Sequence, residues 1–528
     1  MTITVTVRGV TALAVDTTVA ELVSSHVASR IAQSDSTLWG EAAQPEASIR
    51  LGWFSAPQKS RELVEPIEAL RSEFAARGLT RLVLCGMGGS SLAPEMITRT
   101  AGVDLVVLDA THPTQVSRAL DTDIDSTVVV IASKSGSTTE TDSHKRTFEA
   151  AFIAAGIDPV SRIVIVTDPG SPLDVSSREV GYRVFNADPM VGGRYSALTA
   201  FGLVPTGLAG VDITTLLDEA ENAMSDLAAD VPTNPALVLG AAMAARAPEV
   251  NKMLLWTSGS SIVGIGEWIE QLVAESTGKD GQGVLPVVAG HGHPNLGLDD
   301  VVEVTIADTV ASDTDVDVVV SGPLGAQILL WECATAVASR ILGVNPFDQP
   351  DVESAKIASR TFLEREPHTP ADFRRDGDVE FAMAGFTSSS STAQGVVDDL
   401  LALVSSDGYV AIHAYADRAG TMDADEIQSA VVRRTRRPTT FGWGPRFLHS
   451  TGQFHKGGPA QGFFIQIVDL SPTDREIPGR PFTFGTLMSA QADGDAAVLS
   501  GKGRPLLTIR ALTEGGLTSI SRILSSDS

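Results

Sequence analysis

Apolar residues along this chain fall into short β-branched runs that alternate with longer helical patterns. The runs lie in 81–97, 104–110, 128–132 and 162–173, and most are followed by a Gly- or Ser-rich turn. Continuous apolar runs of this length are typical of strands buried on both faces. Strands that alternate with helices predict a parallel sheet covered by helices on both sides.

A second set of the same elements follows. Residues 253–279 repeat the strand, Gly/Ser-rich turn and helix of 81–97. Further strands are predicted in 283–290 and 301–308, and a long buried helix in 321–343. The repetition indicates two related halves.

The flanking regions differ from this pattern. The first residues combine a short strand with helical patterns, and the polar stretch 365–378 is a predicted linker. Near the C-terminus, GYVAIHAYAD and GFFIQIVDL predict strands, and DADEIQSAVVRRTRR predicts an amphipathic helix. The expected fold class is α/β, with these parts: a mostly helical segment 1–75, doubly wound parallel-sheet domains 76–232 and 233–365, and a small α/β unit 377–528.

Composition narrows the function classes. The length of 528 residues suits about three folding units. A net charge of −26 argues against a nucleic-acid partner. No apolar run approaches the roughly 20 residues that a membrane helix needs, and the N-terminus lacks a signal-peptide pattern. Two cysteines leave no disulfide framework and no cysteine zinc site, so we expect a soluble cytoplasmic protein.

The segment 128–141, VVVIASKSGSTTET, is the strongest candidate for chemistry. Hydroxyl side chains and backbone N–H groups at a strand-to-helix turn meet the positive end of the helix dipole, which suits a phosphate monoester. Ligands of open α/β sheets bind at the carboxyl ends of the strands. The alternative is a Ser/Thr-rich helix cap without a ligand. This turn and the Gly/Ser-rich turn of 86–95 both follow predicted parallel strands, so both are candidates for phosphate binding.

Several motifs occur in an order that resembles phosphoglucose isomerases, which are built from two sugar-isomerase (SIS) domains. They are GMGGSSLAPE (86–95), SKSGSTTET (133–141), GGRYSALTAFGLVP (192–205), QLVAESTGK (271–279) and NPFDQPDVESAK (345–356). The tail motif GPRFLHSTGQFHKGGP (444–459) resembles the C-terminal part of the isomerase module in bacterial transaldolase–phosphoglucose isomerase fusions.

The resemblance implies reversible isomerisation of glucose 6-phosphate and fructose 6-phosphate through an enediol(ate), in glycolysis and gluconeogenesis. It implies a sugar phosphate as the small-molecule partner, no cofactor and no metal, and a homodimer as one arrangement of the chain. One alternative is an isomerase that also accepts mannose 6-phosphate. Another is a sugar-phosphate-binding SIS protein without catalysis, which the presence of both Glu275 and Arg194 disfavours.

For the phosphate, the resemblance points to Ser133, Lys134, Ser135 and Thr138 as ligands, with Gly89 and Ser90 in the neighbouring turn.

The resemblance also assigns roles within the other motifs. Glu275 is the expected base that moves a proton between C1 and C2, and Gln271, one helical turn earlier, is a sugar-binding residue. Arg194 is expected to stabilise the enediolate. Lys356 resembles the lysine near the ring oxygen, and Gln349 is a weaker candidate. The structural alternatives are a solvent-facing Glu275, an Arg194 salt bridge and a surface Lys356.

Ring opening requires a group that titrates near neutrality, which favours histidine. His455 in FHKGGP is the candidate, although in the family the histidine segment precedes the FDQP segment and here it follows it. We expect the C-terminal unit to supply it, within one chain or between chains. The rivals are His449, His291 and His293. The HGH spacing of the last two lacks further ligands for a metal, so a turn is expected there.

Overall fold

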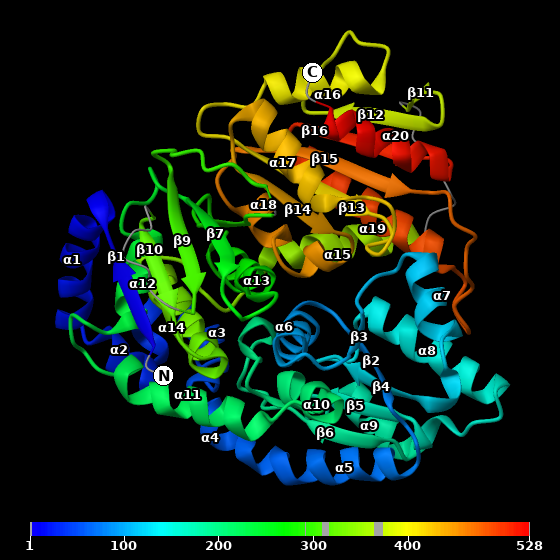
Figure 1. Ribbon diagram of the computed structural model, residues 1–528, viewed down its shortest axis with the longest axis horizontal. Coiled ribbons are helices and arrows are strands. Elements are labelled where there is room, and N and C mark those ends of the chain that lie inside the picture. Colours follow the sequence, from blue (N-terminus) through cyan, green and yellow to red (C-terminus); the bar gives the residue numbers. More distant parts are fainter. Residues whose placement is uncertain (1–2, 291, 309–315, 364–372, 527–528) are drawn as a thin grey trace. The chain divides into compact units, whose positions relative to one another are not determined.

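The structure is a computed structural model that describes residues 3–290, 292–308, 316–363 and 373–526. The chain divides into two compact units (Figure 1). The first unit comprises Met1–Asp109, Ala119–Pro286 and Val301–Asp348. The second unit comprises Ala110–Arg118, Val287–Asp300 and Gln349–Ser528. The domain boundaries expected from the sequence stay predictions.

One sheet of the first unit is entirely parallel, in the order β3-β2-β4-β5-β6. Its central strands are buried on both faces, which explains their continuous apolar runs. The strands are β2 (Arg81–Gly86), β3 (Val106–Leu108), β4 (Thr127–Ala132), β5 (Ile163–Thr167) and β6 (Arg183–Asn186). The helices of this part are α5 (Val64–Ala76), α6 (Leu92–Ala101), α8 (Thr139–Ala154), α9 (Pro172–Val180) and α10 (Ala200–Ala209).

The other sheet of this unit has the order β1-β10-β9-β7-β8. The N-terminal strand β1 pairs antiparallel with β10, with Thr4 opposite Ser321, and β10, β9 and β7 run parallel (Figure 1). The strands are β1 (Thr4–Val7), β7 (Lys252–Gly259), β8 (Leu285–Val288), β9 (Val301–Ala307) and β10 (Val318–Ser321).

Helices α11 (Ile213–Leu227), α12 (Pro235–Ala244), α13 (Ile265–Thr277) and α14 (Leu324–Leu342) accompany this second sheet. All residues of α14 from Gly325 to Ser339 are buried, which confirms the long buried helix predicted over 321–343. The N-terminal region is helical after β1, as expected. Its helices are α1 (Gly9–Ser24), α2 (Val27–Ala32), α3 (Gln44–Ala47) and α4 (Ala56–Lys59).

The second unit is built on a six-stranded sheet in the order β11-β12-β16-β15-β13-β14. The strands β16, β15, β13 and β14 are parallel, and the β11–β12 hairpin joins β16 antiparallel. The strands are β11 (Arg374–Asp376), β12 (Val379–Ala384), β13 (Tyr409–Tyr415), β14 (Thr439–Trp443), β15 (Gly462–Asp469) and β16 (Leu506–Ala511). The helices are α15 (Pro350–Leu363), α16 (Ala393–Ala402), α17 (Ala424–Thr435), α18 (Gly452–Gly457), α19 (Phe484–Gly501) and α20 (Glu514–Ser525), together with most of α7 (Pro113–Asp121).

The predicted linker over 365–378 is wrong at its C-terminal end. Arg374–Asp376 form β11 and pair with β12, so this part belongs to the sheet. The sequence of this strand is polar because β11 lies at the sheet edge with its side chains half or fully exposed, so no apolar pattern predicted it. The remainder, 365–372, lies outside the described residues.

A segment from far earlier in the sequence also belongs to the second unit. His112 lies 3.3 Å from the Asp469 carboxylate, and Arg118 donates to Asp417 at 2.5 Å. Asp417 and Asp469 lie at the carboxyl ends of β13 and β15. The polar groups at this edge of the sheet are therefore paired by residues 110–118.

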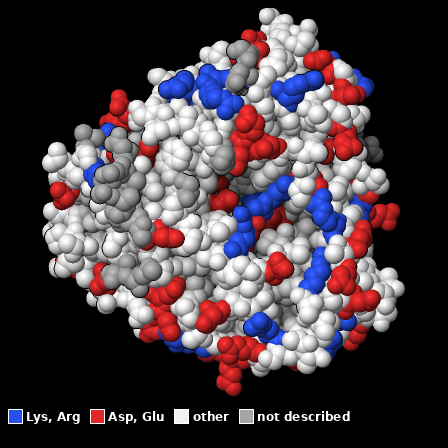
Figure 2. Space-filling view, viewed as in Figure 1, with Lys and Arg blue, Asp and Glu red and all other residues white. Residues whose placement is uncertain are grey.

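Acidic and basic side chains are interspersed over the face shown in Figure 2. In the described parts of the chain, no helix has the length and apolar character needed to cross a membrane.

Candidate active site

The predicted phosphate turn lies between β4 and the start of α8 at Thr139, as the sequence indicated. Its hydroxyl groups form a local network. Ser133 Oγ donates to Thr138 Oγ1 at 3.2 Å, and the hydroxyls of Ser135 and Ser137 lie 2.7 Å apart. The turn therefore gathers several O–H groups at the positive end of a helix, which is the arrangement that phosphate oxygens require.

Lys134 in this turn is not a free surface lysine. Its Nζ lies 2.8 Å from the Asp168 carboxylate and donates to the Val191 carbonyl at 2.8 Å. Burial raises the pKa of Asp168, and the hydrogen bond and charge of Lys134 oppose that shift. The side chain of Lys134 thus ties the turn to the segment that precedes Arg194.

The neighbouring turn, Gly88–Ser90, follows β2 and contains the predicted residues Gly89 and Ser90. A Cβ atom on Gly89 would lie 1.9 Å from the carbonyl oxygen of Gly193. Only glycine permits this close approach of two backbones. The contact packs the Gly89 turn against the short helix Gly193–Tyr195, which carries Arg194.

Arg194 is buried, with a side chain that is 4% exposed. Its Nε donates to Ser276 Oγ at 2.8 Å. Its Nη2 donates to the carbonyls of Pro346 at 2.6 Å and Asp348 at 3.0 Å. Its Nη1 lies 3.3 Å from Oε1 of Glu275. The guanidinium is therefore held on one side by protein carbonyls and faces a carboxylate on another.

Glu275 lies near the C-terminal end of α13, and its side chain is only 6% exposed. The alternative of a solvent-facing residue is therefore wrong. Gln271 lies one turn earlier on the same helix, and its Nε2 donates to Oε2 of Glu275 at 3.2 Å. Thus the structure brings together Glu275, Gln271 and Arg194, and the Arg194–Glu275 ion pair is part of this cluster.

Lys279 belongs to the same cluster and was not among the site residues predicted from the sequence. Its Nζ donates to the Asn345 carbonyl at 2.5 Å and to the carbonyl and carboxylate of Asp348, both at 2.7 Å. Burial lowers the pKa of Lys279 to about 8, and the nearby charge of Arg194 contributes to the same shift. The only sequence signal was its place at the end of the 271–279 motif, because local patterns do not show that a lysine is buried.

Other predicted site residues lie in the second unit. Lys356 is on α15, where its Nζ lies 3.7 Å from Glu353 and its side chain is 38% exposed. Gln349 immediately precedes this helix. This contact is a surface ion pair between residues three apart in the sequence. It fits the alternative that Lys356 is an ordinary surface lysine.

His455 lies on α18 in the interior of the second unit and is 1% exposed. Its Nδ1 lies 3.0 Å from the hydroxyl of Tyr409, and Nε2 has no hydrogen-bond partner among the described residues. Burial, with the nearby His413 and Lys456, holds the pKa of His455 well below its usual value. Asp495 pairs with Lys456 at 2.6 Å and lies 3.3 Å from His413, so His455 belongs to a buried polar network.

The rival histidines are placed differently. His449 is half-buried at the end of the short helix Arg446–His449. His293 is 6% exposed, and its Nδ1 lies 2.9 Å from the Pro294 carbonyl. His291 lies outside the described residues. Among the residues that are described, no three His, Cys, Asp or Glu side chains are grouped so that they could hold a metal ion.

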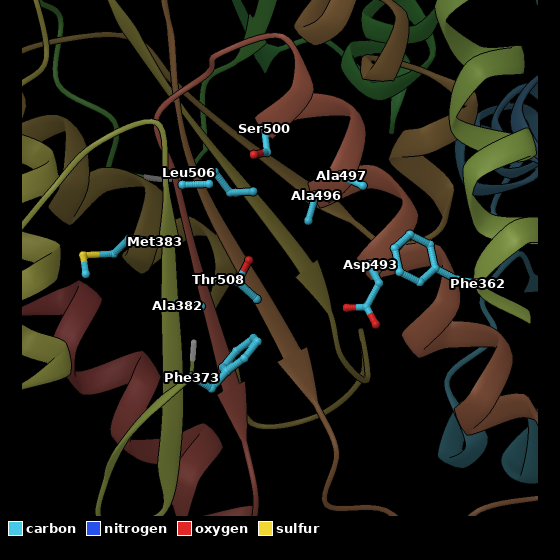
Figure 3. Close-up of a pocket in the computed structure, with 11 residues that line it drawn as sticks. Phe362, Phe373, Ala382, Met383, Asp493, Ala496, Ala497, Ser500, Leu506 and Thr508 are labelled. Atoms are coloured by element: carbon cyan, nitrogen blue, oxygen red, sulfur yellow. The ribbon is translucent and has the colours of Figure 1, made fainter. Parts of the chain in front are cut away.

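A cavity of about 210 Å³ in the second unit is chemically different from this cluster (Figure 3). Most of its lining is apolar, including Phe362, Phe373 and Met383, and Asp493 lies at one side. Asp493 accepts from Arg510 at 2.8 Å, and the Arg510 guanidinium lies 4.0 Å from the Phe373 ring centroid. Since none of the residues predicted for the site lines it, we do not assign the reaction to this cavity.

Comparisons with known proteins match the part of the chain that contains this cluster of Arg194, Gln271 and Glu275. A sequence model of the family described as "Phosphoglucose isomerase" matches residues 19–281. A probable glucose-6-phosphate isomerase of Haloarcula marismortui is 29% identical over 343 residues, which cover 54% of this chain and 78% of that protein. A glucose-6-phosphate isomerase of Rippkaea orientalis is 30% identical over 289 residues, which cover 48% of this chain and 55% of that protein.

A solved structure shows a similar fold. The crystal structure of a hypothetical protein from Thermus thermophilus aligns with a TM-score of 0.56 at 24% identity and covers 66% of this chain and 97% of that chain. The matched residues 19–281 include both Gly/Ser turns, Arg194, Gln271 and Glu275. The resemblance of the tail to transaldolase fusions stays a prediction. Through this shared segment, about half of the chain matches the phosphoglucose isomerase family.

Proposed function

We propose that this protein interconverts glucose 6-phosphate and fructose 6-phosphate by moving a proton between C1 and C2. The observation that carries the proposal is the buried carboxylate of Glu275, 3.3 Å from the Arg194 guanidinium and bound by Gln271. The relatives named glucose-6-phosphate isomerase support the same reaction. We place the reaction in glycolysis and gluconeogenesis, in the cytoplasm.

In the proposed mechanism, Glu275 removes the proton from C2 of the open-chain aldose and becomes a carboxylic acid. The electron pair left behind forms an enediolate across C1 and C2. Glu275 then returns the proton to C1, which yields the ketose, while the hydroxyl proton passes from O2 to O1. One carboxylate can serve both carbons because they are adjacent, and this route requires no metal.

Arg194 has a separate role in this proposal. Its positive charge offsets the negative charge that develops on the enediolate oxygens. The hydrogen bonds to Ser276, Pro346 and Asp348 fix the guanidinium before substrate binds. Such preorganisation lets the group act without rearranging during the reaction.

For the phosphate, we propose a site made by the turn 133–138 and the N-terminus of α8. The hydroxyls of Ser133, Ser135 and Thr138 would donate to phosphate oxygens. Lys134 would contribute its backbone rather than its side chain, which is bound to Asp168 and Val191. The neighbouring turn with Gly89 and Ser90 would complete the site as further contacts of the same anion. Holding a remote phosphate restricts the motion of the reacting carbons.

Ring opening requires a further group in this proposal. His455 remains our candidate for the acid–base group, and Lys356 for a group near the ring oxygen. The lowered pKa of His455 keeps its imidazole neutral, so His455 would begin ring opening as a base.

A coupled assay tests the isomerisation. Purified protein is given fructose 6-phosphate, and a glucose-6-phosphate dehydrogenase reports the product. We expect turnover by the wild type and a loss of at least about 10³-fold in kcat for Glu275→Gln, which keeps the size of the side chain but removes the base. Glu267→Gln, on the first turn of the same helix, is the matched control and should retain activity. Absence of wild-type turnover would exclude the proposed function.

A further inference from the structure

The turn Asn345–Asp348 binds a buried lysine whose role the motifs do not reveal. The side chain of Lys279 is 3% exposed. Its Nζ donates to the Asn345 carbonyl and to the carbonyl and carboxylate oxygens of Asp348, at 2.5–2.7 Å. An ammonium group has three N–H donors. All three therefore have acceptors on this one turn, which leaves no donor of Lys279 for a substrate.

Arg194 binds the same turn from another direction. Its Nη2 donates to the carbonyls of Pro346 and Asp348, so Arg194 and Lys279 share the Asp348 carbonyl. The Nη1 atom of the same guanidinium is the one that faces Glu275. A displacement of the turn would consequently move Arg194 relative to the proposed base.

Aromatic packing fixes the turn on its apolar side. The ring of Phe347 lies 5.1 Å from Trp39 and 5.6 Å from Tyr195, measured between ring centroids. The Phe347 N–H donates to Asn345 Oδ1 at 3.0 Å, which stabilises the turn internally. The carbonyl oxygens of the turn are then directed to the two cations, and loss of one cation leaves buried acceptors without a donor.

We infer that Lys279 is a positioning residue for the isomerisation, which holds the turn 345–348 so that Arg194 faces Glu275. This inference rests on the proposed function. Lys279 itself does not contact the substrate. Its effect is transmitted through the shared carbonyl of Asp348 to the guanidinium of Arg194. A displacement of about 1 Å in such a group is enough to slow a reaction about 10²-fold.

The pKa of Lys279 offers a second test of the inference, through the pH dependence of kcat. The charged groups that face this lysine are Arg194 from the helix Gly193–Tyr195, Glu275 from α13 and Asp348 from the turn. Burial and Arg194 lower its pKa to about 8, whereas Asp348 and Glu275 act in the opposite direction. Deprotonation above this pH removes one of the three donors, so wild-type kcat should fall as pH rises through about 8.

Two variants and their combination test the inference. We expect Lys279→Met to lower kcat about 30- to 100-fold, to change KM less than about threefold and to abolish the fall in kcat near pH 8. Asp348→Asn removes a charge that raises the pKa of Lys279, so the fall should move to lower pH by about half a unit or more. The double variant should be no slower than Lys279→Met alone, because both act on one turn.

The matched control is Lys502→Met, which removes a lysine paired with Asp351 at 2.6 Å in the second unit and should leave kcat and its pH profile unchanged. An unaltered pH profile in Asp348→Asn would overturn the inference, and so would multiplicative losses in the double variant. The side chain of Asp348 is 44% exposed, so we expect Asp348→Asn to fold. Its pH profile therefore tests the inference even if Lys279→Met does not fold. A wild type without isomerase activity would instead refute the proposed function.

Discussion

Gly89→Ala should slow the enzyme through a contact that is entirely steric. The added Cβ would lie 1.9 Å from the carbonyl oxygen and 2.5 Å from the carbonyl carbon of Gly193, and 3.1 Å from the amide nitrogen of Arg194. Real Cβ atoms essentially never approach another atom closer than 3.0 Å, so the two backbones must separate by at least 1.1 Å. None of these three atoms belongs to a side chain that could rotate away.

The required shift displaces the residue next to Gly193, which is Arg194. A misplacement of about 1 Å corresponds to a loss of about 10²-fold in kcat/KM, or about 2.7 kcal/mol of transition-state stabilisation. Steric strain in a packed interior costs about 1–3 kcal/mol of folding stability as well. Steady-state kinetics with fructose 6-phosphate and a thermal unfolding curve separate the two effects.

Gly192→Ala is the matched control for this experiment. Among the described residues, its Cβ would meet only Cδ of Arg50, at 3.8 Å, and the backbone of Gly192 has φ −72° and ψ 154°, which alanine adopts without strain. We expect this variant to stay within about threefold of the wild type. A folded Gly89→Ala protein with kcat/KM equally close to wild type would refute the link between the two turns and Arg194.

Three further predictions concern substitutions of single residues. Glu332 is 1% exposed, and neither carboxylate oxygen has a hydrogen-bond partner among the described residues, so burial raises its pKa well above the usual value. Between pH about 4.5 and this raised pKa, the folded state keeps a proton that the unfolded chain releases, so Glu332 lowers the stability by about 1.4 kcal/mol per pH unit. Glu332→Gln should remove this contribution, so urea unfolding at pH 5.5 and 7.5 should show a smaller loss of stability with rising pH than in the wild type. An identical pH dependence in both proteins would contradict the neutral carboxyl. His455→Gln should reduce turnover of glucose 6-phosphate at least about tenfold more than turnover of an analogue that cannot close its ring, whereas equal losses would assign His455 to structure alone. Ser133→Ala should raise KM about tenfold with kcat nearly unchanged, and an unchanged KM would remove its hydroxyl from the phosphate site.

Local sequence patterns predicted the elements that carry the proposed chemistry. The buried runs in β2, β4 and β5 and the turn before α8 could be read from composition and periodicity alone. The helix that carries Gln271 and Glu275 was also predicted, with both side chains on one face. These features depend on residues close together in the chain, which is why the sequence was sufficient.

Contacts between distant segments could not be predicted in the same way. The pairing of Thr4 with Ser321 and the binding of Lys279 to Asp348 depend on tertiary structure. The same holds for the close approach of Gly89 to Gly193, which no local pattern requires. The interior position of His455 also could not be read from FHKGGP, since a short polar segment gives no measure of burial.

The central claim is that Glu275 carries a proton between two neighbouring carbons. The most direct measurement follows the exchange of that proton with solvent, by NMR of fructose 6-phosphate and glucose 6-phosphate incubated in D₂O with wild type or Glu275→Gln. The account predicts deuterium at C1 of the ketose and C2 of the aldose with the wild type, and essentially none with the variant. Deuterium incorporation by the variant at the wild-type rate would contradict it.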